Sequence, residues 1–346
     1  MTTTFISDDK EVIAVNNISF TLYKGETLGI VGESGSGKSV TALSILKLIP
    51  NPPGRIKSGE IIYYKENGQP IILTTASEKE MRNIRGNEIA MIFQDPMTGL
   101  NPVFTVEEQM VDAILSRQGA LDATAFGRKW LPSNRERRRQ AHARAIQLLR
   151  QVGITDPEKR IHAYPHEFSG GMRQRVLIAM AISGRPDLLI ADEPTTALDV
   201  SVQAQILRLI ADLVRDINLT VLLITHNIGV VAQLCNRIAV MYAGNVVETG
   251  PVRSILRNPQ HPYTRGLLAA IPTDDTPRGT LQGVPGTVPN LYVPPPGCRF
   301  APRCAFARDA CTAAVPPMVR AASSDTPDHQ VACVLYQESA EAELCS

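Results

Sequence analysis

The sequence predicts an α/β fold in which a mostly parallel sheet is covered by helices and a loop-rich extension follows. Short, fully apolar runs provide the strand signal, at residues 27–31, 188–191, 221–224 and 238–241. An amphipathic helical pattern separates the second and third runs, with Val202, Ile206 and Ile210 on one face. Repeated strand–helix–strand order is typical of parallel sheets buried between helices.

Length and charge restrict the function. The chain has 346 residues, which corresponds to about two domains or to one large α/β domain with an extension. Its 35 Lys and Arg nearly balance its 34 Asp and Glu, so the net charge of +1 gives no global field to hold nucleic acid. No apolar run approaches the ~20 residues of a membrane span, and the N-terminus lacks the apolar run of a secretory signal. We therefore expect the polypeptide in the cytoplasm.

The strand signal stops in the middle of the chain and again towards its end. Between about residues 97 and 184 the periodicity is helical, which predicts a helical subdomain inserted into a first domain of residues 1–255. After Gly250, frequent prolines break any long element, so residues 256–346 are expected to form a C-terminal extension. The sequence indicates no role for residues 117–134.

Residues 32–39, Gly-Glu-Ser-Gly-Ser-Gly-Lys-Ser, match the G-x-x-x-x-G-K-[ST] phosphate loop. The match lies between a predicted strand and a predicted helix, which is the context that this loop requires. Glycines let backbone N–H groups curl around phosphate oxygens, while Lys38 would reach the β- and γ-phosphates and Ser39 would bind Mg²⁺. The residues expected to contact the nucleotide here are Gly32, Ser34, Gly35, Ser36, Gly37, Lys38, Ser39 and Val40.

Two carboxylates, Asp192 and Glu193, follow the apolar run at residues 188–191. Ligands bind at the carboxyl ends of the strands in parallel α/β sheets, so Asp192 is expected beside Mg²⁺. Glu193 points to the other side of the strand end, where it could orient or deprotonate an attacking water. Together with the phosphate loop, this pair predicts phosphoryl transfer.

His226 and Gln94 are the other candidate catalytic residues. His226 ends the apolar strand that begins at Val221, so we expect it at the same sheet edge as Asp192, where it can donate to a γ-phosphate oxygen. Gln94 lies at the junction with the helical insertion, where we expect it to touch Mg²⁺ or the water and to report the state of the nucleotide.

A second anion-binding feature begins at Ser169. This serine and two glycines, Gly170 and Gly171, start a predicted helix, and such helix starts attract anions. A γ-phosphate held between the phosphate loop of one subunit and the helix start of another would make ATP join two subunits. The sequence therefore suggests a nucleotide site shared across a dimer.

Four of the six cysteines, Cys298, Cys304, Cys311 and Cys333, fall in one tract near the C-terminus. In a reducing compartment such a group is more typical of a metal site than of disulfides. The spacing lacks the close C-x2-C pairs of common zinc sites, and it leaves zinc, an iron–sulfur cluster and inert thiols open.

In this combination and order the motifs resemble the ATP-binding cassette (ABC) family. The hallmarks are the phosphate loop, the Gln94 loop, the signature at Ser169, the Asp192–Glu193 pair, Asp199 in Ala197-Leu-Asp199, and His226. More narrowly, the chain is similar to the peptide/nickel importer ATPases through Phe93-Gln-Asp-Pro-Met-Thr98, Tyr164-Pro-His-Glu-Phe-Ser169, Thr195-Thr-Ala-Leu-Asp199, His261-Pro-Tyr-Thr264 and the cysteine tract. Met172 stands where the wider family usually has glutamine, but Gly-Gly-Met is common in this subfamily.

The resemblance implies partners and a location. It implies a peripheral subunit on the cytoplasmic face of the cell membrane, paired with a second ABC ATPase subunit, as a heterodimer, beneath two permease subunits. An extracytoplasmic solute-binding protein would supply the solute. The fold that it implies is the P-loop ABC nucleotide-binding domain, with a helical subdomain and a small cysteine-cluster extension.

The resemblance also implies cofactors and binding residues. They are ATP and Mg²⁺, with Ser39, Gln94 and Asp192 around the metal ion and Asp199 beside the nucleotide. Phe5 stands where the family stacks an aromatic ring on adenine. The recurrence of Cys-Arg-Phe-x-Pro-Arg-Cys implies a 4Fe–4S cluster on the four cysteines, with zinc as the alternative.

The implied function is the coupling of ATP binding and hydrolysis to uptake of di- or oligopeptides. Import of nickel or glutathione is the alternative within the same class. A soluble, non-transport ABC-type ATPase is the alternative from another class, although such relatives carry tandem cassettes or a long coiled-coil insertion, and the sequence has no internal repeat. A third alternative is a redox-sensing protein. The intact Glu193 and the intact signature argue against it, because they indicate ATP turnover.

Overall fold

The computed structural model describes residues 1–7, 10–65, 67–95, 99–122, 134–196, 198–271, 283–321 and 326–337. The chain divides into two compact units. Unit 1 comprises Met1–Leu22, Thr27–Thr75 and Leu223–Ser346, and unit 2 comprises Tyr23–Glu26 and Ala76–Leu222. The division passes through strand β9 (Thr220–Thr225). Residues 117–134, for which the sequence indicated no role, lie only partly within the described ranges.

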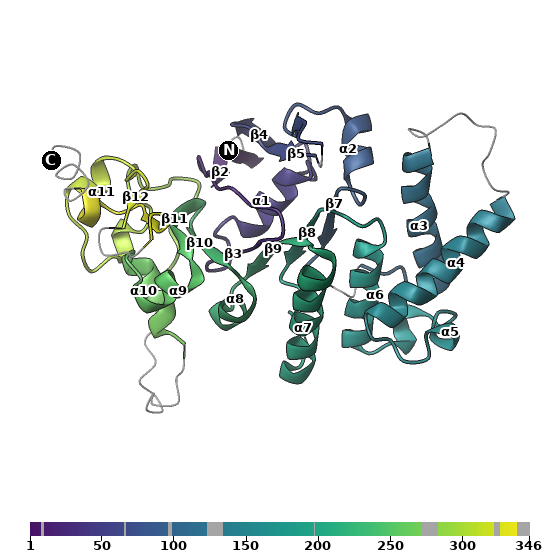
Figure 1. Ribbon diagram of the computed structural model, residues 1–346. Helices are drawn as coiled ribbons and strands as arrows, with labels where there is room; N and C mark the ends of the chain where they lie inside the picture. Colours follow the sequence, from purple (N-terminus) through teal and green to yellow (C-terminus); the bar gives the residue numbers. More distant parts are fainter. Residues whose placement is uncertain are drawn as a thin grey trace. The chain divides into compact units, whose positions relative to one another are not determined.

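Unit 1 contains the phosphate loop and the described part of the C-terminal extension (Figure 1). Its strands are β1 (Thr2–Ser7), β2 (Lys10–Val15), β3 (Thr27–Val31), β4 (Gly54–Ser58), β5 (Ile62–Tyr64), β6 (Pro70–Ile72), β10 (Arg237–Tyr242), β11 (Asn245–Pro251), β12 (Val319–Arg320) and β13 (Gln330–Val331). Its helices are α1 (Lys38–Ile45), α8 (Ile228–Leu234), α9 (Val252–Arg257), α10 (Pro262–Ala269) and α11 (Ala310–Ala313), with 3-10 turns η3 (Ala301–Arg303) and η4 (Val334–Tyr336).

The larger sheet of unit 1 has the order β12-β13-β11-β10-β3. Strands β3 and β10 are parallel, with Leu28 opposite Arg237, as the buried apolar runs predict. The remaining pairs in this part of the sheet are antiparallel. The strand direction reverses between β10 and β11 because the two strands are joined by the two-residue turn Ala243-Gly244, whose φ values of 46° and 85° suit a tight hairpin. The predicted parallel arrangement therefore holds only for part of unit 1.

A separate antiparallel sheet, β2-β1-β4, was not predicted from the sequence. Phe5 of β1 pairs with Val12 of β2 on one side and with Gly54 of β4 on the other. The strand begins with Thr2, Thr3 and Thr4, so it lacks the apolar run by which the other strands are recognised. A further pair, β5 and β6, forms a two-stranded sheet.

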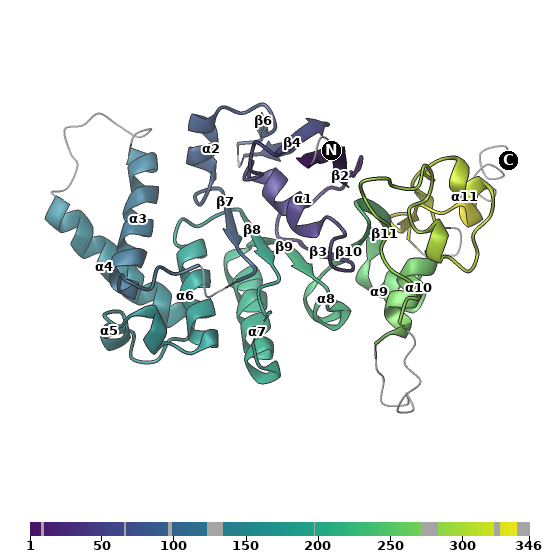
Figure 2. The same ribbon diagram turned by 180° about the vertical axis from the view of Figure 1, so that it is seen from behind.

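The core of unit 1 joins its sheet to the C-terminal extension through aromatic rings. Tyr242 of β10 lies 4.6 Å from Tyr263 of α10 and 5.1 Å from Phe300, measured between ring centroids. All three side chains are buried. The view from behind shows β11 next to α9, with the C-terminal segments on the same side (Figure 2). Phe300 belongs to the proline-rich extension, so the extension shares a core with the strand that neighbours β3.

A buried carboxylate also ties the extension to this sheet. Glu248 of β11 accepts the backbone N–H groups of Gln260, at 2.8 Å, and His261, at 3.0 Å. Its Oε1 is 2.7 Å from Nε2 of His329, and both side chains are fully buried. A buried carboxylate needs such partners, and these come from the start of α10 and from the segment before β13.

Unit 2 is mainly helical. Its helices are α2 (Glu78–Ile84), α3 (Val106–Asp122), α4 (Asn134–Gln151), α5 (Pro157–Arg160), α6 (Gly170–Ile182) and α7 (Val200–Ile217), with one 3-10 turn, η2 (Pro165–Glu167). Strands β7 (Ile89–Ile92) and β8 (Leu188–Asp192) pair in parallel. Helices α3 and α4 lie side by side in both views, and α6 contacts α4 and α7 (Figures 1 and 2). In the described part of residues 97–184 the regular elements are all helical.

Arg117 of α3 fixes the end of α6. Its guanidinium donates to the carbonyl oxygens of Met180 and Ala181 and to the hydroxyl of Ser183. These are acceptors at the carboxyl end of the helix, where a positive charge is favourable. Arg117 is the first residue of the segment 117–134, so one residue of that segment now has a structural role.

None of the described helices combines the length and the apolar character needed to cross a bilayer.

Candidate functional site

The phosphate loop connects β3 to α1 and depends on its glycines. A Cβ on Gly32 would lie 2.1 Å from the carbonyl oxygen of Met241, and one on Gly37 would lie 2.6 Å from that of Ala14. Gly37 also has a φ of 96°, which side chains rarely adopt. The loop therefore packs so closely on β10 and β2 that larger residues cannot replace these two glycines.

Lys38 is the first residue of α1 and lies inside the curve of the loop. Its side chain is 5% exposed, and Nζ donates to the carbonyl oxygens of Gly32, at 2.8 Å, and Glu33, at 3.0 Å. The first turn of α1 contains no acidic residue, so the positive end of the helix is not neutralised there. The hydroxyl of Ser36 is buried and has no hydrogen-bond partner among the described residues. These groups suit a bound phosphate.

In unit 2 the structure brings together two residues that the sequence predicted as catalytic. Nε2 of Gln94 donates to Oε2 of Glu193 at 3.1 Å, and the hydroxyl of Thr196 donates to the same oxygen at 2.9 Å. Glu193 has a φ of 47°, an uncommon conformation for a residue other than glycine. The carboxylate directly after β8 is thus held by two neutral donors.

Asp192 is the last residue of β8 and is 4% exposed. It lies in unit 2, as do Gln94 and Glu193, whereas the phosphate loop lies in unit 1. His226 follows β9, is exposed and also lies in unit 1. The joint roles expected for these residues around Mg²⁺ and the γ-phosphate remain predictions.

The signature residues stand at the start of α6. Ser169 is the N-cap residue, and its exposed hydroxyl accepts the backbone N–H of Met172 at 3.3 Å. A Cβ on Gly171 would lie 2.4 Å from Cγ1 of Val202 in α7. Gly171 is therefore required for the close contact of α6 with α7. Asp199, also exposed, is the N-cap residue of α7.

Phe5, expected to stack on adenine, is half-buried in β1. Its ring lies against Gly54, where a Cβ would be 2.7 Å from Cε1. One edge of the ring therefore packs within the small antiparallel sheet. The contact with adenine stays a prediction.

The four cysteines of the extension are all free thiols. Cys311 and Cys333 are buried, and Cys298 and Cys304 are half-buried. Each sulfur faces a backbone N–H group; the one nearest Cys311 comes from Arg308, 3.4 Å away. Burial is the main cause that raises the pKa of Cys333 to about 11; the backbone N–H of Leu335 opposes the rise, and the neighbouring thiols add to it.

These thiols do not form a metal site as they stand. Among the described residues, no group of three or more His, Cys, Asp or Glu side chains is arranged to hold a metal ion. The prediction of a 4Fe–4S cluster is therefore not supported by the geometry, and neither is its zinc alternative. The number and kind of donors, together with the amides that face the sulfurs, do suit an iron–sulfur cluster.

Sequence reasoning missed the residues that hold Glu33 of the phosphate loop. Tyr263 accepts its backbone N–H, and Arg303 pairs with its carboxylate. Arg303 follows Glu33 by 270 residues, so no local pattern could have connected them. Thr196 belongs to the family motif at residues 195–199, and this motif did not predict its contact with Glu193.

Two family models match the chain. The "ABC transporter" model matches residues 15–196, and the model for the "Oligopeptide/dipeptide transporter, C-terminal region" matches residues 247–311. The second match includes Cys298, Cys304 and Cys311 and ends before Cys333.

Similar proteins include several peptide-transport ATPases. A putative peptide import ATP-binding protein of Brucella melitensis is 47% identical over 98% of this chain and 96% of its own. The oligopeptide transport ATP-binding protein OppD of Bacillus subtilis is 50% identical over 91% of this chain and 82% of its own. The dipeptide transport ATP-binding protein DppD of Escherichia coli is 50% identical over 88% and 86%, respectively.

The fold is also found among solved structures. The ATP-binding cassette MJ0796, in a dimeric post-hydrolysis state bound to ADP and Pi, has a TM-score of 0.58 at 27% identity, covering 73% of this chain and 96% of that one. The sequence, the fold and the arrangement of the phosphate loop therefore all indicate the same family.

Proposed function

Since this chain belongs to the ABC transporter ATPases and is the ATPase of a dipeptide or oligopeptide importer, we propose which of its residues carry out each step of ATP binding and hydrolysis. The phosphate loop, from Gly32 to Val40, binds the triphosphate, and Lys38 contacts the β- and γ-phosphates. The buried position of Lys38 inside the loop supports this assignment. Phe5 stacks on the adenine.

Hydrolysis is assigned to the carboxylates after β8. Asp192, Ser39 and Gln94 bind Mg²⁺, Glu193 deprotonates or orients the attacking water, and His226 donates to the γ-phosphate. The observation that carries this proposal is the pair of hydrogen bonds from Gln94 and Thr196 to one oxygen of Glu193. These bonds hold the carboxylate at the carboxyl end of β8, and Gln94 links the base to the start of the helical subdomain.

The second nucleotide contact is assigned to a partner ATPase subunit. Ser169, Gly170, Gly171 and Asp199 meet the ATP held by the phosphate loop of that subunit. The exposure of Ser169 at the N-terminus of a 13-residue helix supports this contact, because a helix start attracts a γ-phosphate. ATP then favours the closed dimer by binding it more tightly than the open one, and hydrolysis releases it.

The importer has further components in this proposal. Two membrane permeases carry the peptide, a solute-binding protein delivers it, and this chain lies on the cytoplasmic face of the membrane as half of an ATPase heterodimer. The peptide-transport relatives support a peptide over nickel or glutathione.

We assign a 4Fe–4S cluster to Cys298, Cys304, Cys311 and Cys333, in an extension that begins after residue 255. Four thiols in one region, each facing an amide N–H group, support the assignment. The test is iron and acid-labile sulfide analysis of anaerobically purified protein. About four irons with matching sulfide, lost in Cys304→Ser, are expected. Protein that contains zinc without sulfide, or neither iron nor zinc, would contradict the assignment of the cluster.

Transport is tested by reconstitution. The complex that copurifies with this chain from membranes is placed in vesicles with ATP outside, on the side of the ATPase, and its solute-binding protein inside. Efflux of labelled dipeptides and oligopeptides from the vesicles, dependent on ATP, is expected. Transport of nickel or glutathione alone would identify the alternative importer. Association of the chain with ribosomes, and with no permease, would support the soluble ATPase instead.

A further inference from the structure

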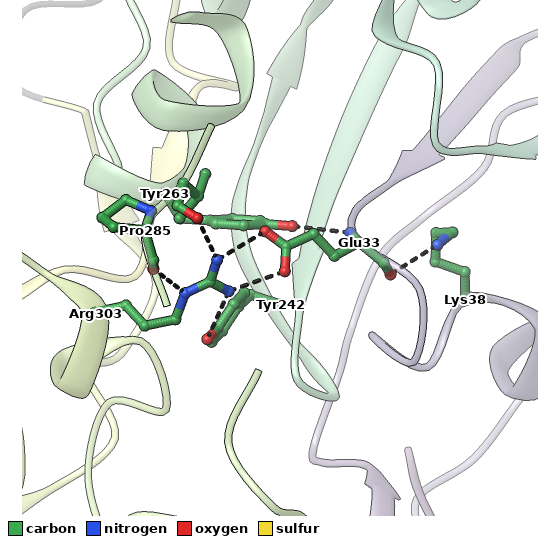
Figure 3. Close-up of polar contacts among 7 residues, drawn as sticks. Glu33, Lys38, Tyr242, Tyr263, Pro285 and Arg303 are labelled. Carbon is green, nitrogen blue, oxygen red and sulfur yellow. Dashed lines mark hydrogen bonds and ion pairs between the residues drawn. The ribbon is translucent and has the colours of Figure 1, made fainter. Parts of the chain in front are cut away.

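Glu33, the second residue of the phosphate loop, is held at all three of its polar positions (Figure 3). Its backbone N–H donates to the hydroxyl of Tyr263 at 2.9 Å. Its carbonyl oxygen accepts from Nζ of Lys38 at 3.0 Å. Its carboxylate meets the guanidinium of Arg303. Two of these three contacts are made by Tyr263 and Arg303, which both follow β11. The C-terminal extension therefore fixes the position of Glu33, which itself contacts Lys38.

The contact between Arg303 and Glu33 uses two nitrogens and two oxygens. Nη1 lies 2.9 Å from Oε2, and Nη2 lies 3.3 Å from Oε1. The side chain of Arg303 is only 6% exposed, and that of Glu33 is 28% exposed. A two-pronged pair of this kind fixes direction as well as distance, and burial protects it from the screening that weakens surface pairs.

Arg303 is placed by its own surroundings as well as by Glu33. Nε donates to the carbonyl oxygen of Pro285 at 2.7 Å, and Nη2 donates to that of Val284 at 2.9 Å. Nη1 is 3.3 Å from the hydroxyl of Tyr242, whose ring lies 5.6 Å from the guanidinium carbon. The backbone of the extension therefore orients the arginine towards the loop.

An unpaired carboxylate on Glu33 would oppose ATP binding, and the pair with Arg303 prevents this. A free carboxylate beside a triphosphate repels it, and the repulsion is stronger in a site partly shielded from water. It would also attract Lys38, whose charge the phosphates need. Pairing with Arg303 cancels the charge of Glu33 and keeps its side chain turned towards the extension.

We propose that Arg303 is a positioning residue for ATP: through Glu33, the C-terminal extension holds the phosphate loop in its nucleotide-binding form. The proposal rests on the assignment of residues 32–40 as the ATP site. It gives the extension a part in the ATPase cycle in addition to any metal that it carries. The effect is larger for ATP than for ADP, because ATP carries more negative charge towards the loop.

The test compares charge with shape at position 303 in the full chain. Arg303→Gln keeps N–H donors for the carbonyls of Val284 and Pro285 but removes the charge. It should weaken MgATP binding by about 10-fold, and MgADP binding by less. Arg303→Lys keeps the charge and should bind MgATP within about 3-fold of the parent. The matched control is Arg320→Gln, which removes an exposed charge from the same extension and should bind normally.

A second arm separates positioning from loss of folding. In the Glu33→Gln background no carboxylate is left unpaired, so Arg303→Gln should cost less than about 2-fold in MgATP affinity. In the assembled ATPase, Arg303→Gln should raise the KM for ATP and leave kcat nearly unchanged. Melting temperatures show whether each variant is folded.

Three results would overturn the proposal. The first is an unchanged MgATP affinity in Arg303→Gln. The second is an equal loss of MgATP affinity from Arg303→Gln in the parent and in the Glu33→Gln background, and the third is a loss in Arg303→Lys as large as that in Arg303→Gln. Failure of the parent chain to bind MgATP would instead contradict the proposed function.

Discussion

Gln94 donates its side-chain N–H to Oε2 of Glu193 at 3.1 Å, although the two residues are 99 positions apart in the chain. Gln94 follows β7 and Glu193 follows β8, and these strands are parallel neighbours in unit 2. Their carboxyl ends therefore emerge side by side. This contact joins the residue proposed as the base to the residue proposed to report the state of the nucleotide.

Glu193→Gln should reduce steady-state ATP hydrolysis by about 10²–10⁴-fold, because a positioned base is removed while the shape of the side chain is kept. ATP binding should be unchanged, since the phosphate loop is intact. Turnover and nucleotide affinity are measured in the assembled complex with the partner subunit inactivated. Glu158→Gln, which alters an exposed pair with Arg150, is the control and should hydrolyse normally. Near-normal turnover in Glu193→Gln would remove the residue from this role.

Lys38→Ala should weaken ATP binding itself, by about 10–100-fold, because a charge-assisted contact with the phosphates is lost. Equilibrium titration of the purified chain with MgATP measures the effect. Lys79→Ala removes an exposed lysine from α2 and should leave the affinity unchanged. Equal affinities in the parent and Lys38→Ala would contradict the assignment of the loop.

Ser169→Arg should preserve ATP binding by the isolated chain and block ATP-driven closure of the dimer. The hydroxyl is exposed at the start of α6, so a larger, charged side chain there is tolerated in the single chain but obstructs a contact with the partner. Crosslinking across the interface, with and without ATP, measures closure. Ser116→Arg, on the exposed side of α3, is the control. Normal closure in Ser169→Arg would rule out the shared site.

Folding stability should fall in acid because of His261. Burial is the main cause that lowers the pKa of this side chain to about 4, with Arg265 acting in the same direction and Glu248 opposing it. The unfolded chain, with a histidine pKa of about 6.5, therefore takes up a proton that the folded chain does not bind. This difference costs about 2 kcal/mol of unfolding free energy between pH 7 and pH 5.

Urea unfolding at the two pH values measures that loss. His261→Asn keeps an acceptor for the backbone N–H of Tyr263 but cannot be protonated, so its stability should depend less on pH. The exposed variant His166→Asn should keep the slope of the parent. Identical slopes in the parent and His261→Asn would show that this histidine does not control acid stability.

The sequence by itself determined the elements and motifs that depend on contiguous residues. The apolar run at residues 27–31 is strand β3, the glycine loop follows it, and a helix, α1, follows the loop as expected. Ser169 caps α6, and Asp192 ends β8. Each of these features follows from a few neighbouring side chains, whose apolar periodicity or capping chemistry favours one local structure.

The tertiary structure decided what depends on distant residues. It placed Gln94 against Glu193, formed the antiparallel sheet from β1, β2 and β4, and brought Arg303 to Glu33 across 270 residues. It also left the four cysteines outside the geometry of a metal site among the described residues. Local propensity does not encode such contacts, because they form only when burial of apolar surface, as around Tyr242 and Phe300, brings the segments together.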